Sequence, residues 1–222
     1  MKMKNDRLPG KNTKLLGGIT PLYHLILKEL LLVEGISEVY VFCSLPELPD
    51  LPRGIGYLQR SPELDSPLTS INEVMESFAT QIEADAYLMA HATAPFLSKK
   101  SLGQIVDAVK TGGHDSALSV TKVQEFLWKD GAPNNYDPSN IPRTQDLPAL
   151  FVETTGAYAY TSAVLSQGSR IGKNPKLVHV SKIEAVDVND RNDWEVADAL
   201  FRLRGFRQEG SAGLPSPRGE AR

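Results

Sequence analysis

The sequence predicts an α/β fold in which a mostly parallel sheet carries helices on both faces. Short runs rich in β-branched and aromatic residues alternate with helical patterns through the first two thirds of the chain, which favours strand–helix–strand units. The 222 residues are 41% hydrophobic and 23% charged, a composition that supports one large buried core. Ligands of such folds bind beyond the carboxyl ends of the strands, so residues at those ends are the candidates for function.

Each element has a local signal. The apolar runs expected to form strands lie at residues 38–43, 56–59, 86–90, 117–120, 156–160 and 176–180. Apolar residues spaced three and four apart, mostly after a Ser, Thr or Pro, predict helices over about residues 22–33, 66–82, 98–111 and 191–203.

The rest of the chain predicts the domain organisation. Residues 125–150 are polar and rich in Pro and Asn, which is typical of a functional loop or an arm that contacts a partner. Residues 205–222 are expected to be disordered, because Gly, Ser, Pro and charged residues bury little apolar surface. One domain is therefore expected over residues 1–204.

Composition excludes several classes of protein. The formal net charge is -3 and no basic stripe runs along the chain, so a nucleic acid polymer is not an expected partner. Cys43 is the only cysteine, which excludes an internal disulfide and a multi-cysteine metal site. The longest apolar stretch, residues 22–33, contains charged residues and is too short to cross a bilayer. With no signal-peptide core at the N-terminus, a cytoplasmic location without membrane contact is expected.

Four segments could carry chemistry, and the first is the basic opening of the chain. Gly10 lets the backbone approach a ligand, while Lys4, Arg7 and Lys11 could face phosphate oxygens. The alternative is a solvated basic N-terminus. The segment lacks the glycine pattern of a P-loop.

The second segment directly follows the expected strand at residues 86–90. His91 and Thr93 are polar and lie where the strand ends, a place suited to holding a base or a ribose. The alternative is a histidine that is hydrogen-bonded for structural reasons.

The third segment precedes the last helix. Asp187 and Asn189 are two residues apart, so in extended backbone both could offer oxygen atoms to one Mg²⁺. The alternative is helix capping by Asp190 and Asp193. Both can hold, because capping uses Asp190 and a metal would use Asp187.

The fourth segment lies within the long excursion. Arg143 and Gln145 together can bind a carboxylate or a phosphate, and a plain surface loop is the equal alternative.

In this order, the segments resemble the acylneuraminate cytidylyltransferase family, which includes the CMP-sialic acid synthetases. The resemblance covers roughly residues 2–200. The matching segments are residues 8–12 with 15–18 and 21–22, residues 60–64 (the family's Arg-Pro-x-x-Leu), 91–96 (Gln-x-Thr-Ser-Pro-Leu), 143–148 (Arg-x-Gln), 156–158 (the glycine-aromatic strand) and 187–189 (Asp-x-Asp).

The resemblance implies a Rossmann-like nucleotide-diphospho-sugar transferase fold, a homodimer, and Mg²⁺ as cofactor. It implies that the hydroxyl at the anomeric carbon of an acidic sugar attacks the α-phosphate of CTP and releases pyrophosphate. The residues that it assigns are Lys4, Lys11, Asn12 and Arg60 for the nucleotide, His91, Thr93, Arg143 and Gln145 for the sugar, Asp187 and Asn189 for the metal, and Lys11 and Arg143 for catalysis.

Four departures from the family pattern shape the hypotheses. The family opens with a buried strand, and because none precedes Met1 we expect the true start to lie upstream. In-frame codons for apolar residues before Met1 would show this. Lys2 stands where the family has arginine, Asn189 replaces the second aspartate, and His91 replaces glutamine. The leading hypothesis is an enzyme that makes a CMP-activated nonulosonic acid. The alternatives are a nucleotidyltransferase for a KDO-type acid or another sugar, and a nucleotide-sugar-binding relative that has lost turnover.

Overall fold

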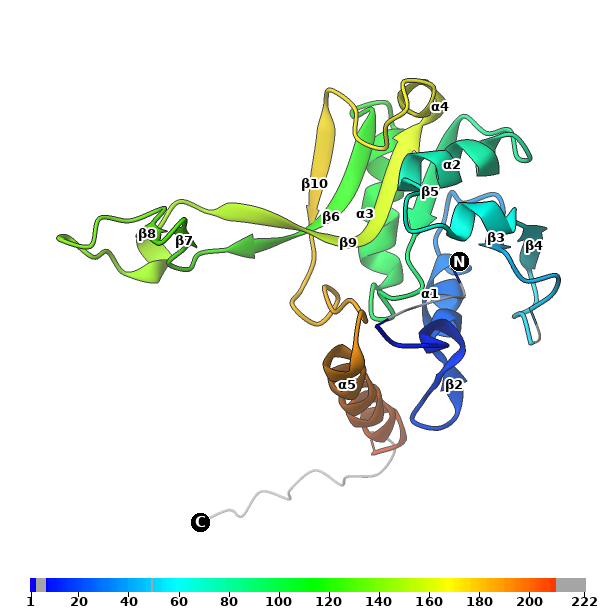
Figure 1. Ribbon diagram of the computed structural model, residues 1–222, viewed down its shortest axis with the longest axis horizontal. Coiled ribbons are helices and arrows are strands. Elements are labelled where there is room, and N and C mark those ends of the chain that lie inside the picture. The colour runs from blue at the N-terminus through cyan, green and yellow to red at the C-terminus, as the bar shows by residue number, and fades with distance from the viewer. Residues whose placement is uncertain (3–6, 49, 211–222) are drawn as a thin grey trace, which may run out of the picture.

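Helices cover both faces of a central sheet, as the sequence predicts (Figure 1). The structure, a computed structural model, describes residues 1–2, 7–48 and 50–210. The helices are α1 (Leu22–Leu30), α2 (Ile71–Ala79), α3 (Lys99–Lys110), α4 (Ser162–Leu165) and α5 (Arg191–Gly210), with 3-10 turns η1 (Lys11–Thr13), η2 (Pro62–Asp65) and η3 (Thr144–Asp146). Among the described residues, no helix has the length and apolar character that crossing a bilayer requires.

The central sheet has four strands in the order β10–β6–β9–β5. Their bounds are β5 (Ala86–Ala90), β6 (Ser116–Val123), β9 (Leu150–Thr161) and β10 (Pro175–His179). The β10 and β6 strands are parallel, whereas β9 runs antiparallel to both β6 and β5. Three strands therefore point one way, and β9 reverses because the chain returns to it from β6 without a crossover helix.

Three further strand pairs lie outside this sheet, and one of them belongs to the arm described below. The parallel pair β3 (Val39–Cys43) and β4 (Ile55–Gln59) is not hydrogen-bonded to β5 within the described ranges. The α-amino group of Met1 donates a hydrogen bond to the carbonyl oxygen of Phe42 in β3. The expectation of a strand upstream of Met1 stays a prediction. Near the N-terminus, β1 (Leu15–Leu16) and β2 (Thr20–Pro21) form a short antiparallel pair.

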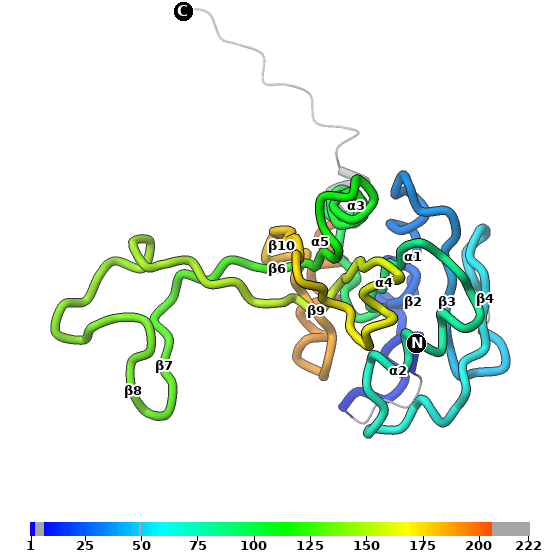
Figure 2. Tube along the Cα trace, turned by 90° about the horizontal axis from the view of Figure 1, so that it is seen from above, coloured from blue at the N-terminus to red at the C-terminus, as the bar shows by residue number. Residues whose placement is uncertain are grey.

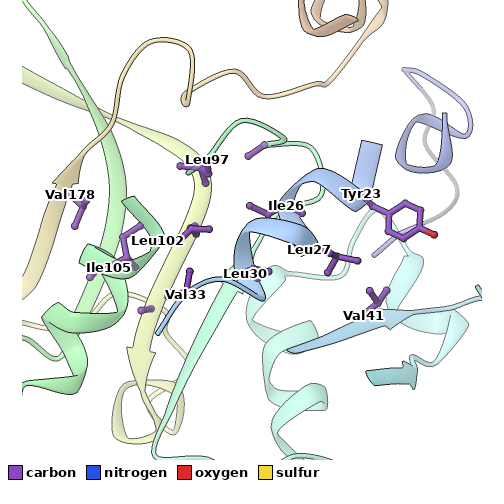
Figure 3. Close-up of a cluster of buried hydrophobic side chains, with 14 of the residues drawn as sticks. Tyr23, Ile26, Leu27, Leu30, Val33, Val41, Leu97, Leu102, Ile105 and Val178 are labelled. Atoms are coloured by element: carbon purple, nitrogen blue, oxygen red, sulfur yellow. The ribbon is translucent and has the colours of Figure 1, made fainter. Parts of the chain in front are cut away.

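The main core lies between α1, α3 and one face of the sheet. Figure 3 shows Leu102 and Ile105 of α3 with Ile26 and Leu30 of α1, all of which are buried. The opposite face of the sheet packs against α2 and α4, whose buried side chains meet aromatic residues of β9. Helices therefore cover both faces of the sheet, and the carboxyl ends of β5 and β6 remain available for a functional site.

A long arm projects from the body at the ends of β6 and β9 (Figures 1 and 2). It carries the two-residue strands β7 (Trp128–Lys129) and β8 (Ala132–Pro133), followed by η3. Its exposed large apolar side chains, with those of the adjoining β9, are Phe126, Trp128, Ile141, Leu150, Phe151 and Val152. The predicted excursion over residues 125–150 is therefore an extended hairpin.

Two helix bounds differ from the sequence prediction. The α2 helix begins at Ile71 rather than near residue 66, because Ser70 and Glu73 form a reciprocal capping box there. The α5 helix continues to Gly210, past the predicted end at residue 203, and the disordered tail over residues 205–222 stays a prediction. Extending an established helix costs little per residue, even through a glycine. Residues 211–222 lie outside the described residues, and their predicted disorder is untested.

Candidate active site

Three of the four predicted segments meet at the carboxyl end of the sheet. The Nζ atom of Lys11 in η1 donates a hydrogen bond to the carbonyl oxygen of Val188 at 2.8 Å. The backbone N–H of Val188 donates to the carbonyl oxygen of Thr93, also at 2.8 Å. His91 begins the same turn, and its N–H donates to the carbonyl oxygen of Gly156 at 2.9 Å. The opening segment, the turn after β5 and the loop before α5 are therefore joined.

Local backbone geometry places Lys11 in this cluster. Gly10 precedes it with φ 67°, a left-handed conformation that glycine adopts at little cost, and η1 starts at the next residue. The Lys11 side chain is only 8% exposed. Burial lowers its pKa, and the nearby Asp187 carboxylate opposes that effect. Lys11 is thus a partly desolvated cation, whose attraction to a phosphate is stronger than that of an exposed lysine.

Asp187 has one engaged and one free carboxylate oxygen. Its Oδ2 accepts hydrogen bonds from Nδ2 of Asn189 at 2.7 Å and from Oγ1 of Thr155 at 3.3 Å. Its Oδ1 is buried and has no hydrogen-bond partner in the described part of the chain. A buried carboxylate oxygen without a partner is a suitable ligand for a hard cation.

Asn189 does not point its oxygen at the place where Asp187 could bind a metal. Its Oδ1 accepts a hydrogen bond from Nη2 of Arg7 at 2.9 Å, and its amide nitrogen faces Asp187. The capping alternative is present: Asp190 accepts from the N–H of Asp193, and Asp193 accepts from the N–H of Asp190. The predicted pairing of Asp187 and Asn189 as two oxygen ligands is therefore not the arrangement observed. No group of three or more His, Cys, Asp and Glu side chains suited to a metal occurs among the described residues.

His91 is held in its neutral form. Burial lowers its pKa, the Asp187 carboxylate opposes this, and the positive charge of Arg170 adds to the lowering. Its Nε2 is buried without a hydrogen-bond partner in the described ranges. A neutral imidazole with one free nitrogen can accept or donate one hydrogen bond to a ligand.

Of the three remaining nucleotide candidates, Asn12 and Arg60 lie within the described residues. Nδ2 of Asn12 donates to the carbonyl oxygen of Lys2 at 2.8 Å. Arg60 follows β4, is 5% exposed, and forms an ion pair with Asp65, which also accepts from Oγ of Ser44 at 2.6 Å. The other nucleotide candidate, Lys4, lies outside the described residues.

Unpartnered buried atoms gather on the predicted site residues. Five buried side-chain atoms lack a hydrogen-bond partner in the described residues, and four of them belong to Asn12, Arg60, His91 and Asp187. The fifth is Nε2 of His24 on α1. Buried polar groups are nearly always paired in folded proteins, so this concentration favours a ligand-binding site.

Arg143 and Gln145 do not lie in this cluster of their own chain. Both belong to the exposed segment around η3 on the arm, which projects away from the body (Figure 2). Arg143 binds Asp146 through Nε at 2.7 Å and Nη2 at 3.1 Å. Their assignment to the sugar site, and that of Arg143 to catalysis, therefore requires the arm of a second copy.

Two site residues were missed by sequence reasoning. Thr155 has φ 56°, a strained conformation for a β-branched residue, at an irregularity of β9 beside Asp187. Arg170, in the loop between α4 and β10, lies over the Tyr158 ring, and its charge acts on the His91 side chain. No sequence signal marks either residue, because a positive φ at threonine and the direction of a loop arginine depend on tertiary contacts.

Known proteins resemble this chain in sequence. The family model for cytidylyltransferases matches residues 1–180. N-acylneuraminate cytidylyltransferase A of Danio rerio is 27% identical over 210 residues, which cover 90% of this chain and 49% of that protein. The chain thus spans about half the length of this curated relative.

Solved structures agree on the fold. A structure of CMP:2-keto-3-deoxy-manno-octonic acid synthetase complexed with CTP matches with a TM-score of 0.66 at 18% identity, covering 92% of this chain and 96% of that one. A 4-diphosphocytidyl-2C-methyl-D-erythritol synthase from Anaerococcus prevotii matches with a TM-score of 0.61 at 14% identity, covering 86% and 93%. With the match over residues 1–180, these findings establish that the chain belongs to the cytidylyltransferase family.

Proposed function

We propose that this protein transfers CMP from CTP to the anomeric hydroxyl of an acidic sugar of the nonulosonic type. The hydroxyl oxygen forms a bond to the α-phosphorus, and the bond from that phosphorus to the bridging oxygen breaks. Pyrophosphate leaves with the electron pair, and the hydroxyl proton is released to solvent. The observation that carries the proposal is the convergence of Lys11, His91 and Asp187 at the end of the sheet.

The charges of the cluster suit this reaction. Transfer of a nucleotidyl group depends mainly on positioning and on neutralising the phosphates. Lys11 and Arg60 are buried cations that can serve the triphosphate, and Asn12 has a free buried oxygen for a ribose hydroxyl. Neutral His91 fits the uncharged hydroxyl groups of a sugar better than a second phosphate.

Mg²⁺ fits the site as an ion with one protein carboxylate. Asp187 would hold it through the free Oδ1, and phosphate oxygens and water would complete the coordination, as is usual for this ion. When bound, the ion would neutralise phosphate charge. Asn189 would support Asp187 through its amide rather than bind the ion itself.

We also propose that the enzyme works as a homodimer joined through the arm. The arm exposes apolar side chains, including Trp128 at 64% and Ile141 at 63% exposure, which is costly in water unless another surface covers them. A second copy packed on the arm would also bring Arg143 and Gln145 towards a neighbouring site.

Pyrophosphate release from CTP and Mg²⁺ with a panel of sugars tests the function. The panel contains N-acetylneuraminic acid, KDO and 2-C-methyl-D-erythritol 4-phosphate. We expect release with a nonulosonic acid, and Lys11→Met should reduce it at least a hundredfold, while the exposed control Lys176→Met should not. Release with KDO alone would identify a KDO-type enzyme. Binding of CTP without release from any sugar would support a binding protein.

A further inference from the structure

Arg170 is a cation at the site to which no role has been assigned. Its guanidinium carbon lies 3.9 Å from the ring centroid of Tyr158, the shortest cation–ring contact in the described part of the chain. Tyr158 is fully buried in β9, so the ring is a fixed platform. A guanidinium group held by a ring face keeps its N–H donors available around its edge.

The acidic neighbour of Arg170 does not use these donors fully. Nη2 of Arg170 is 4.0 Å from Oε2 of Glu153, which is longer than a hydrogen bond. The same Oε2 accepts a hydrogen bond from the Tyr158 hydroxyl at 2.7 Å. By contrast, Arg143 binds Asp146 with two short contacts, at 2.7 and 3.1 Å. Arg170 therefore keeps the capacity to bind a planar anion with two parallel hydrogen bonds.

The platform stands beside the catalytic cluster. Tyr158 pairs with Met89 of β5, and His91 lies two residues further along the chain, directly after the end of that strand. The N–H of His91 bonds the carbonyl of Gly156, two residues before Tyr158. The charges of Asp187 and Arg170 both act on the His91 side chain, which fits their being neighbours. The Arg170 side chain is 22% exposed, so part of it is accessible to a ligand.

We propose that Arg170, oriented by the Tyr158 ring, binds the carboxylate of the acidic sugar and selects acids over neutral sugars. This inference rests on the proposed function. Lys11 would serve the phosphates and Arg170 the carboxylate, so each anionic group of the two substrates has its own cation. Arginine suits the second task because its planar fork matches a carboxylate, whereas lysine offers a point charge.

Steady-state pyrophosphate release with Arg170→Met and Arg170→Lys tests the assignment. The sugar is the panel acid that the wild-type protein uses, and its carboxamide is the matched neutral analogue. We expect Arg170→Met to raise the KM for the acid tenfold to a hundredfold, the range for a lost charged hydrogen-bonded contact. The KM for CTP should stay within twofold. The preference for acid over carboxamide should disappear, and Arg170→Lys should restore part of it.

Arg53→Met removes an exposed arginine before β4 and is the control for loss of charge. An unchanged KM for the acid in Arg170→Met would overturn the assignment. An equal rise in both KM values, with a lower Tm, would instead show that Arg170 only braces Tyr158 and Glu153. If the wild-type protein releases no pyrophosphate with any acid, the proposed function fails first, and this inference fails with it.

Discussion

Replacing Glu184 tests how the loop that carries Asp187 is held. The Oε1 atom of Glu184 accepts from the hydroxyl groups of Ser98 at 2.6 Å and Ser101 at 2.7 Å, at the start of α3. Its Oε2 accepts from the N–H and hydroxyl of Ser181 at 3.1 and 3.0 Å. One carboxylate therefore ties the first turn of α3 to the loop that leads to Asp187.

The magnitude follows from the pKa of Glu184. Burial opposes its charged form, but the hydrogen bonds from Ser98, Ser101 and Ser181 outweigh burial and lower the pKa from 4.5 to about 2. That difference corresponds to roughly 3 kcal/mol of stability at neutral pH. Partial solvation of the side chain reduces the expected contribution to about 2 kcal/mol. Glu184→Gln should then lower Tm by roughly 4–8 °C for a domain of this size.

The dependence on pH has a definite sign. Because the folded-state pKa lies below that of the unfolded chain, the stabilisation is complete above pH 4.5 and is lost as pH falls towards 2. Urea unfolding at pH 7 and pH 3.5 should therefore show a smaller gap between Glu184→Gln and wild type at the lower pH. Glu195→Gln, at an exposed ion pair on α5, is the control and should cost less than about 0.5 kcal/mol. An equal gap at both pH values would refute the reasoning.

Four further predictions concern the site. Asp187→Ala should abolish Mg²⁺-dependent pyrophosphate release and leave the circular dichroism spectrum unchanged, and normal turnover would remove Asp187 from the metal site. Thr155→Gly should relieve the backbone strain of the positive φ and raise the free energy of unfolding by up to about 1 kcal/mol. It should also lower kcat, because Asp187 loses a hydrogen bond, and an unchanged kcat would count against this positioning role. Below pH 6.5 the histidine of the unfolded chain binds a proton that the buried histidine does not bind, so the folded protein loses stability there. His91→Gln should reduce this loss, and urea unfolding at pH 7 and 5.5 would show it. Asn189→Asp should weaken binding of CTP with Mg²⁺, measured by calorimetry, because it adds a negative charge beside the phosphates and removes the amide donor to Asp187; unchanged or tighter binding would contradict this.

Much of this architecture could be predicted from sequence, because it rests on local patterns. The strands at residues 86–90 and 38–43 are short apolar runs, and their positions agree with the structure to within one residue. The convergence of three polar segments also follows from strand order, since the carboxyl ends of parallel strands share one edge of a sheet.

The remaining features depend on contacts that sequence does not encode locally. The reversed direction of β9 follows from the arm, which returns the chain without a helix. The amide of Asn189 turns its oxygen to Arg7, a partner 182 residues away in sequence. Arg170 enters the site because Tyr158 and Glu153 hold its guanidinium group, and no spacing rule connects these residues.

The balance of charge explains why a single free carboxylate can suffice at this site. Asp65 pairs with Arg60, whereas neither Lys11 nor Asp187 forms an ion pair within the described residues. Burying such groups costs free energy unless a ligand completes their interactions. A triphosphate with Mg²⁺ would do so, because its oxygens meet the lysine while the ion meets Asp187. A second carboxylate at position 189 would add negative charge beside the phosphates, and the neutral amide avoids that repulsion while still orienting Asp187.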